Sequence, residues 1–145
     1  MTGVSNEVFL MIWIVLFLSM TWLHIYDDYH TQGILAQFKQ KKWWKENNPQ
    51  DLYKNDWKIA LYEHAFQWSF TMMLPLLVYS IWAWKESGLY HSLIWWTGLL
   101  TINTKIHAEI DNEKANELKI SLFTDQILHI LQIGFTIIFF MIGAN

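Results

Sequence analysis

Four long apolar stretches dominate this sequence and limit what the chain can fold into. They cover residues 8–25, 59–84, 89–106 and 122–142. A helix of roughly 20 apolar residues crosses the ~30 Å hydrocarbon core of a bilayer. Hydrophobic residues make up 53% of the 145 residues and charged residues only 16%, which is too apolar for an ordinary soluble domain of this length. We therefore expect an all-α fold: one integral membrane domain, residues 1–145, built as a four-helix bundle.

The lysines predict how the four spans are oriented. An up-and-down bundle places the connection 26–58 and the connection between the third and fourth spans on one side. Counted to the span ends, these two connections hold Lys39, Lys41, Lys42, Lys45, Lys54, Lys58, Lys105, Lys114 and Lys119. The other side holds Lys85 alone. Because cytoplasmic loops carry the excess of lysine, we expect a multi-pass protein of the inner (cytoplasmic) membrane with both termini on the outer side.

The connection 26–58 contains the stretch KQKKWWKENNPQDLYKNDWK, which alternates lysine with aromatic residues. Such a composition is typical of a helix that lies in the membrane interface. We expect an interfacial helix here, with Trp43, Trp44 and Trp57 facing lipid and the lysines facing headgroups. The alternative is a solvated, partly disordered loop.

Histidine and carboxylate side chains gather at the cytoplasmic ends of all four spans. Every span supplies one histidine, and three spans add an aspartate four residues away; the set is His24, Asp28, His64, His107, Asp111, Asp125 and His129. Residues i and i+4 are only about 40° apart around a helix, so each pair can face the bundle interior. Ionisable groups inside a span are costly and mark functional sites. We place His30, His91, Asp27 and Glu113 at the interface instead.

Imidazole and carboxylate groups together predict a divalent metal site. The sequence has no cysteine, so thiolate ligands are excluded and a structural zinc site is disfavoured. Zinc is the first expectation, and manganese or iron are the alternatives. Seven candidate ligands are more than one tetrahedral ion needs, so we expect two ions, or one ion with carboxylates that orient the histidines. A metal-free alternative is a buried hydrogen-bond network that joins the helices.

Taken in order, these motifs resemble a family of small multi-span membrane proteins of bacteria and phages, known as a domain of unknown function. The motifs are HxxxDxxxQ starting at His24, a single His64, HxxxDxxK starting at His107, and DQxxH starting at Asp125. The resemblance covers nearly the whole chain, although the lysine- and tryptophan-rich insertion departs from the family pattern. The layout is more distantly similar to membrane-bound metal-dependent hydrolases. The resemblance implies a shared site and no particular reaction.

The leading functional hypothesis is a metal-dependent hydrolase that acts at the cytoplasmic headgroup level on a lipid or a lipid-linked or phosphorylated substrate. In it, Asp28 or Glu63 is the general base, and Lys114 with Lys105 holds a phosphate or an oxyanion. The second hypothesis is a non-enzymatic phage or bacterial membrane protein with a structural metal or polar core that binds a partner through residues 38–58. The third is a cation or proton conductor, although the outer halves of the spans carry almost no ionisable groups.

The same observations predict the partners of the chain. Membrane lipids surround the four spans, and a lipid-like substrate fits a site at headgroup depth. Because four helices make a small bundle, a homodimer is also expected. The formal net charge of −3 argues against a nucleic-acid partner.

Overall fold

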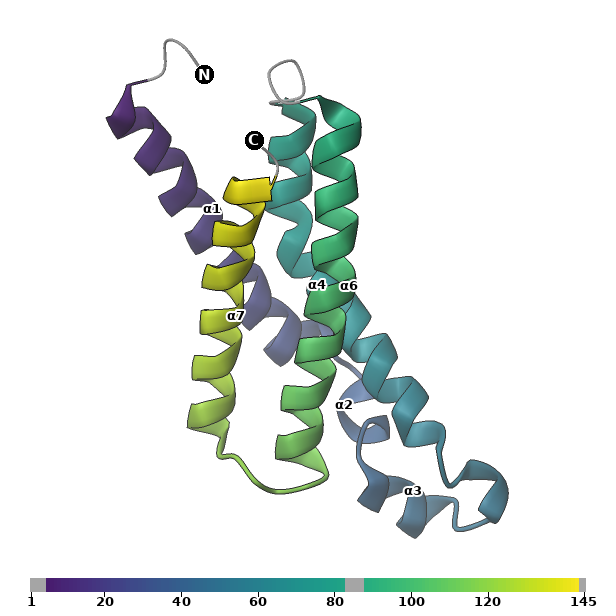
Figure 1. The fold of residues 1–145 in the computed structure, drawn as a ribbon. Helices are drawn as coiled ribbons and strands as arrows, with labels where there is room; N and C mark the ends of the chain where they lie inside the picture. The colour runs from purple at the N-terminus through teal and green to yellow at the C-terminus, as the bar shows by residue number, and fades with distance from the viewer. Residues whose placement is uncertain (1–4, 83–87, 144–145) are drawn as a thin grey trace.

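The computed structural model describes residues 5–82 and 88–143, and these residues form helices and no strand. The all-α prediction is therefore confirmed for the described part of the chain. The four long helices are α1 (Asn6–Tyr26), α4 (Asp56–Trp82), α6 (Leu89–Ala115) and α7 (Leu122–Gly143). α1 and α6 each pack against both α4 and α7, so the helices surround one common interior. The start of α1 and the end of α7 lie at one end of the bundle, and α2 and α3 lie at the other (Figure 1).

Two helical segments are long and apolar enough to cross a membrane, Asn6–Thr31 and Leu122–Gly143. Elsewhere in the described chain no helix meets the same criterion. α4 and α6 are as long, but their residues are on average less hydrophobic than those of α1 and α7. The four-span arrangement therefore stays a prediction. Residues 83–87, with the predicted end of the second span and Lys85, lie outside the described residues.

The apolar core fills the half of the bundle nearest the start of α1. Met20, Trp68, Leu76 and Ile133 are completely buried there. The outer faces of α1 and α7 are apolar as well and include many exposed leucine, isoleucine and phenylalanine side chains. Apolar residues on both faces are typical of helices surrounded by lipid. This pattern agrees with the two candidate spans.

Short helical pieces replace the single interfacial helix that we expected between residues 26 and 58. They are a π-helical turn η1 (Asp27–Thr31), α2 (Leu35–Phe38), α3 (Lys41–Asn47) and a 3-10 turn η2 (Asp51–Tyr53). The lipid-facing orientation predicted for Trp57 is wrong, because its side chain is only 9% exposed and packs with Leu61, Ala65 and Ala108. Trp44 packs against the same cluster. The segment therefore folds back onto α4 and α6.

Candidate metal centre

The structure brings the predicted histidines and aspartates together in the interior, between the four long helices. α1 supplies His24, the turn after it Asp28, α4 His64, α6 His107 and Asp111, and α7 Asp125 and His129. All four histidines are completely buried. The i, i+4 pairs on α6 and α7 face inward as predicted, because both helices continue without a break through these residues.

Three ligand atoms from α4 and α6 form a compact triangle. His64 Nε2 lies 3.2 Å from His107 Nε2, and Asp111 Oδ2 lies 3.2 Å from the first nitrogen and 3.6 Å from the second. A tetrahedral zinc ion with ligand bonds of 2.0–2.2 Å separates its ligand atoms by roughly 3.3 Å. The triangle therefore has the dimensions that one ion requires.

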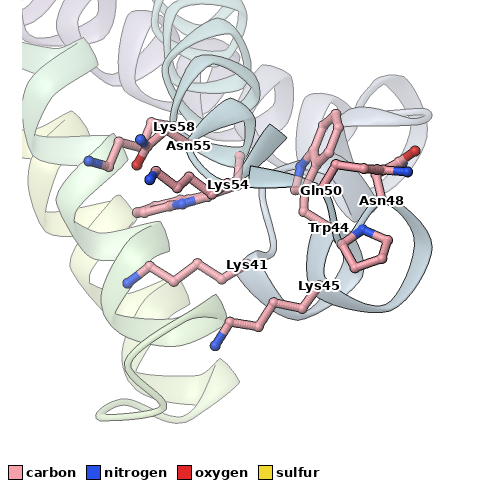
Figure 2. A pocket seen from close by; sticks show the side chains of 10 residues that line it. Lys41, Trp44, Lys45, Asn48, Gln50, Lys54, Asn55 and Lys58 are labelled. Atoms are coloured by element: carbon pink, nitrogen blue, oxygen red, sulfur yellow. The ribbon is translucent and has the colours of Figure 1, made fainter. Parts of the chain in front are cut away.

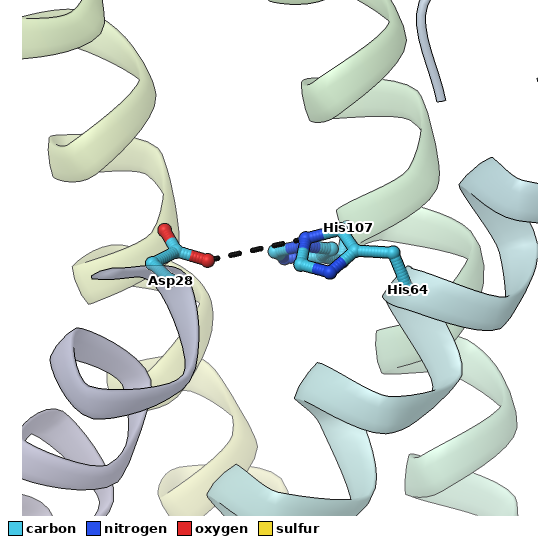
Figure 3. Close-up of side chains that lie close together, drawn as sticks. All are labelled: Asp28, His64 and His107. Carbon is cyan, nitrogen blue, oxygen red and sulfur yellow. Dashed lines mark hydrogen bonds and ion pairs between the residues drawn. The ribbon is translucent and has the colours of Figure 1, made fainter. Parts of the chain in front are cut away.

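Asp28 faces this triangle from the other side of the interior. Its Oδ1 lies 4.0 Å from His64 Nε2, and Figure 3 shows the carboxylate directed at the imidazoles of His64 and His107. Its Oδ2 accepts a hydrogen bond of 3.2 Å from the Gln126 amide. Asp28, His64 and His107 together form one candidate ligand group for a metal ion.

A second candidate group consists of His107, Asp111 and His129. His129 Nε2 lies 3.4 Å from Asp125 Oδ1 and 3.8 Å from Asp111 Oδ1. Both His129 ring nitrogens and Asp125 Oδ1 are buried without a hydrogen-bond partner. Buried polar atoms normally have a partner, so unpaired ligand atoms that face one another fit a cation between them. Asp111 touches both groups, with Oδ2 toward His64 and Oδ1 toward His129.

We predicted His24 as a metal ligand, but in the structure both of its ring nitrogens have hydrogen-bond partners. The Trp68 indole, which can only donate, donates to His24 Nδ1 at 2.8 Å. His24 Nε2 lies 3.2 Å from Gln126 Oε1, an acceptor, so this nitrogen carries the hydrogen. The Gln126 orientation is supported by its amide nitrogen, which lies near Asp28 and Asp125. Both nitrogens of His24 are therefore hydrogen-bonded, and His24 is in neither of the two candidate ligand groups.

Two lysines pair with the aspartates. Lys39 Nζ lies 2.5 Å from Asp111 Oδ2, and Lys114 Nζ lies 2.6 Å from Asp125 Oδ2. Lys114 was predicted to hold a substrate phosphate, and in the structure it is committed to Asp125. The sequence analysis counted Lys39 only among the lysines of the connection 26–58, and its burial, with 8% of the residue exposed, was not predicted.

The carboxyl group of Asp111 is held in its charged form. Asp111 lies beyond the predicted third span. Burial alone would raise the pKa of Asp111, but His107, His129, His64 and Lys39 together hold that pKa well below its usual value. An ionised carboxylate is the form that binds a metal ion.

Glu63 and Lys105 do not join the site, so their predicted roles as general base and phosphate ligand are not supported. Both side chains are exposed. Neighbouring residues on a helix are about 100° apart, so Glu63 cannot face inward while His64 does. Asp28 is the remaining candidate for the base.

Asp27 is buried, which contradicts its predicted interfacial position. Its side chain is 1% exposed and accepts hydrogen bonds from the Thr31 hydroxyl and, at 3.1 Å, from the Gln67 amide. The π-helical turn is the local cause, because its wider winding lets Asp27 and Asp28 both turn away from solvent. No sequence pattern that we used signals this turn.

Trp68 is a site neighbour that the sequence analysis did not identify. Its ring stacks on His107 with the centroids 4.1 Å apart, and its indole nitrogen bonds His24. Its position four residues after His64 on α4 was a signal that it shares the inward face.

No protein-family model, no curated protein and no solved structure matches this chain. The resemblance to the bacterial and phage membrane family therefore stays a prediction.

Proposed function

We propose that the chain is a multi-span membrane protein that binds one or two divalent ions, zinc first, and hydrolyses a lipid or a lipid-linked or phosphorylated substrate at the cytoplasmic headgroup level. The observation that carries the proposal is the triangle of His64, His107 and Asp111, with edges of 3.2 to 3.6 Å. The unpaired atoms around His129 favour a second ion, with Asp111 between the two. Pairs of ions about 3.5–4 Å apart are common in phosphate-processing sites.

When bound, a divalent ion supplies water activation, because it lowers the pKa of a bound water to about 7. The residues of this chain would accept the proton and orient the groups around it. Asp28 is the candidate base, since Gln126 holds one of its oxygens and the other faces His64. Lys114 could neutralise a phosphate only after it leaves Asp125, so substrate binding and this ion pair would compete.

The depth of the site supports a substrate at the headgroup level. His24 and Asp28 lie in the last part of the candidate span Asn6–Thr31, and Asp125 lies in the first turn of the candidate span Leu122–Gly143. Both positions are at the lysine-rich end of their segments. Ionisable groups tolerate this depth because water and headgroups are near.

Elemental analysis of protein purified in mild detergent tests the metal site. We expect about one or two equivalents of zinc, manganese or iron in the natural sequence, in line with the ligand count of such sites. The double variant His64→Ala/His107→Ala should lose the metal. His30→Ala is the matched control, because His30 is exposed and outside the cluster. Equal metal content in the double variant and the control would rule out this site.

The complete burial of the four histidines favours a second candidate function, a non-enzymatic protein with a structural metal or a polar core. Structural zinc sites are closed, whereas catalytic ones keep an open position. Asp28→Asn separates the two. A hydrolase whose ion is held by His64, His107 and Asp111, with Asp28 as the base, would keep its metal and lose hydrolysis of phospholipid headgroups. If the metal-loaded natural sequence hydrolyses no phosphorylated lipid and unfolds at a much lower temperature after chelation, the metal is structural.

A further inference from the structure

A second polar feature lies apart from the metal centre, at the end of the bundle formed by α3, η2 and the start of α4. It is a pocket of about 470 Å³ (Figure 2). Its lining includes Lys41, Lys45, Lys54, Lys58, Trp44 and Trp57. Figure 2 shows the four lysine side chains extending toward the same side of the pocket. The volume lies within the range of small-molecule binding sites.

The positive charge of this pocket is only partly compensated. Lys41 lies 3.1 Å from Glu117, which lowers the pKa of Glu117, and Lys54 lies 4.0 Å from the exposed Asp51. Within the described residues, Lys45 and Lys58 have no carboxylate within 4 Å. Like charges gathered around one cavity repel each other, and an anion in the cavity relieves that repulsion.

The walls of the pocket are aromatic and held in place. Lys41 Nζ lies 4.4 Å from the centre of the Trp57 ring, and Lys58 Nζ lies 5.7 Å from it. The Trp44 indole donates to the Phe38 carbonyl at 2.6 Å. The Lys41 backbone donates to Asn116 Oδ1 at 2.7 Å, which ties the pocket to the end of α6. The backbone at Lys41 and the side chain of Trp44 are therefore held in place before any ligand binds.

We propose that this pocket binds the negatively charged phosphate group of a phosphate monoester, with the aromatic walls against the apolar part of the same molecule. Lysine is a common phosphate ligand because its ammonium is a compact charge with several donors. The phosphate can come from a membrane phospholipid or from a small soluble phosphate compound. The site shares no residue with the metal centre, so it binds its ligand whether or not metal is present.

Binding to the full-length protein in an uncharged detergent tests the pocket, with dihexanoyl phosphatidic acid, dihexanoyl phosphatidylcholine and inorganic phosphate as probes. The pocket variant is Lys45→Gln/Lys58→Gln. The matched control is Lys42→Gln/Lys119→Gln, which removes the same charge from exposed lysines outside the pocket. We expect the pocket variant to weaken phosphatidic acid binding by roughly 10- to 30-fold and the control to change it little.

The probes separate the two sources of phosphate. Tighter binding of phosphatidic acid than of inorganic phosphate assigns the pocket to a lipid, and equal or tighter inorganic phosphate binding assigns it to a soluble compound. Binding that persists after chelation, with zinc content unchanged in both variants, separates the pocket from the metal centre. Equal losses in the two variants, binding of phosphatidylcholine as tight as that of phosphatidic acid, or no binding of any probe would overturn the proposal.

Discussion

At the scale of single residues, four buried histidines of similar sequence context differ in what their ring nitrogens contact. His24 has both nitrogens occupied, by the Trp68 indole and the Gln126 carbonyl oxygen. His64 and His107 instead face each other with Nε2 atoms 3.2 Å apart, and each has an unpaired Nδ1. Two imidazole nitrogens at this distance share one hydrogen or one cation. His24 is therefore a supporting histidine, whereas His64 and His107 are candidate metal ligands.

His24→Ala should therefore keep the metal and bind it more weakly. Partners that orient metal ligands typically contribute a factor of about 10–100 to affinity, and His24 acts on Asp28 and Asp125 through Gln126. His64→Ala, by contrast, should lose stoichiometric binding. Competition with a chromogenic chelator measures both variants. Complete loss of metal from His24→Ala would return this residue to the ligand set.

Lys39→Met should destabilise the protein most when no metal is present. The substitution leaves Asp111 buried without its ammonium partner, and breaking a buried ion pair in this way costs about 3–5 kcal/mol. A bound cation would replace the lost charge, so saturating zinc should recover much of the loss. Thermal unfolding in detergent, with chelator and with zinc, measures the difference. Lys42→Met, at an exposed position on α3, is the control, and an equal loss under both conditions would contradict a cation beside Asp111.

At the scale of helices, the π-helical turn after α1 decides which carboxylates enter the interior. Asp27 is 1% exposed and the Asp28 side chain 8% exposed, although successive residues of a regular α-helix face directions about 100° apart. In the wider π-helical turn, the side chains of Asp27 and Asp28 can both face the interior. Gln67 on α4 then bonds Asp27 and the Thr31 carbonyl, which ties the turn to the neighbouring helix.

Gln67→Leu should lower the free energy of unfolding by about 1–3 kcal/mol, because it removes a donor from the buried carboxylate of Asp27. Denaturant unfolding in mixed detergent measures the change. Gln37→Leu is the matched control, since Gln37 is exposed on α2. If the two variants unfold alike, the Gln67 contact does not stabilise the turn.

Helical spacing predicts only contacts within one regular helix. It correctly paired His107 with Asp111 and Asp125 with His129, because α6 and α7 are continuous there. It could not place Lys39, which reaches Asp111 only because the chain turns back after α1. Periodicity also could not distinguish His24 from a ligand, since its partner Trp68 comes from another helix.

At the scale of the whole molecule, both proposed sites lie toward the same end of the bundle. The metal centre is in the interior between the four long helices, and the lysine pocket lies beside α3 (Figure 2). The start of α1 and the end of α7 lie at the other end (Figure 1). An orientation that places the lysine-rich end in the cytoplasm therefore brings both sites to the inner leaflet. The positive-inside rule predicts this orientation.

Cysteine labelling tests the orientation directly, because the natural sequence has no cysteine and gives no background. Asn6→Cys introduces an exposed thiol at the start of α1, and Lys119→Cys introduces one in the exposed connection between α6 and α7. In intact bacterial spheroplasts, a membrane-impermeant maleimide should label Asn6→Cys, and it should label Lys119→Cys only after the membrane is permeabilised. The reverse pattern would invert the topology and move both sites to the outer leaflet. Labelling of both positions without permeabilisation would place them on the same side and contradict a bundle whose long helices all cross the bilayer.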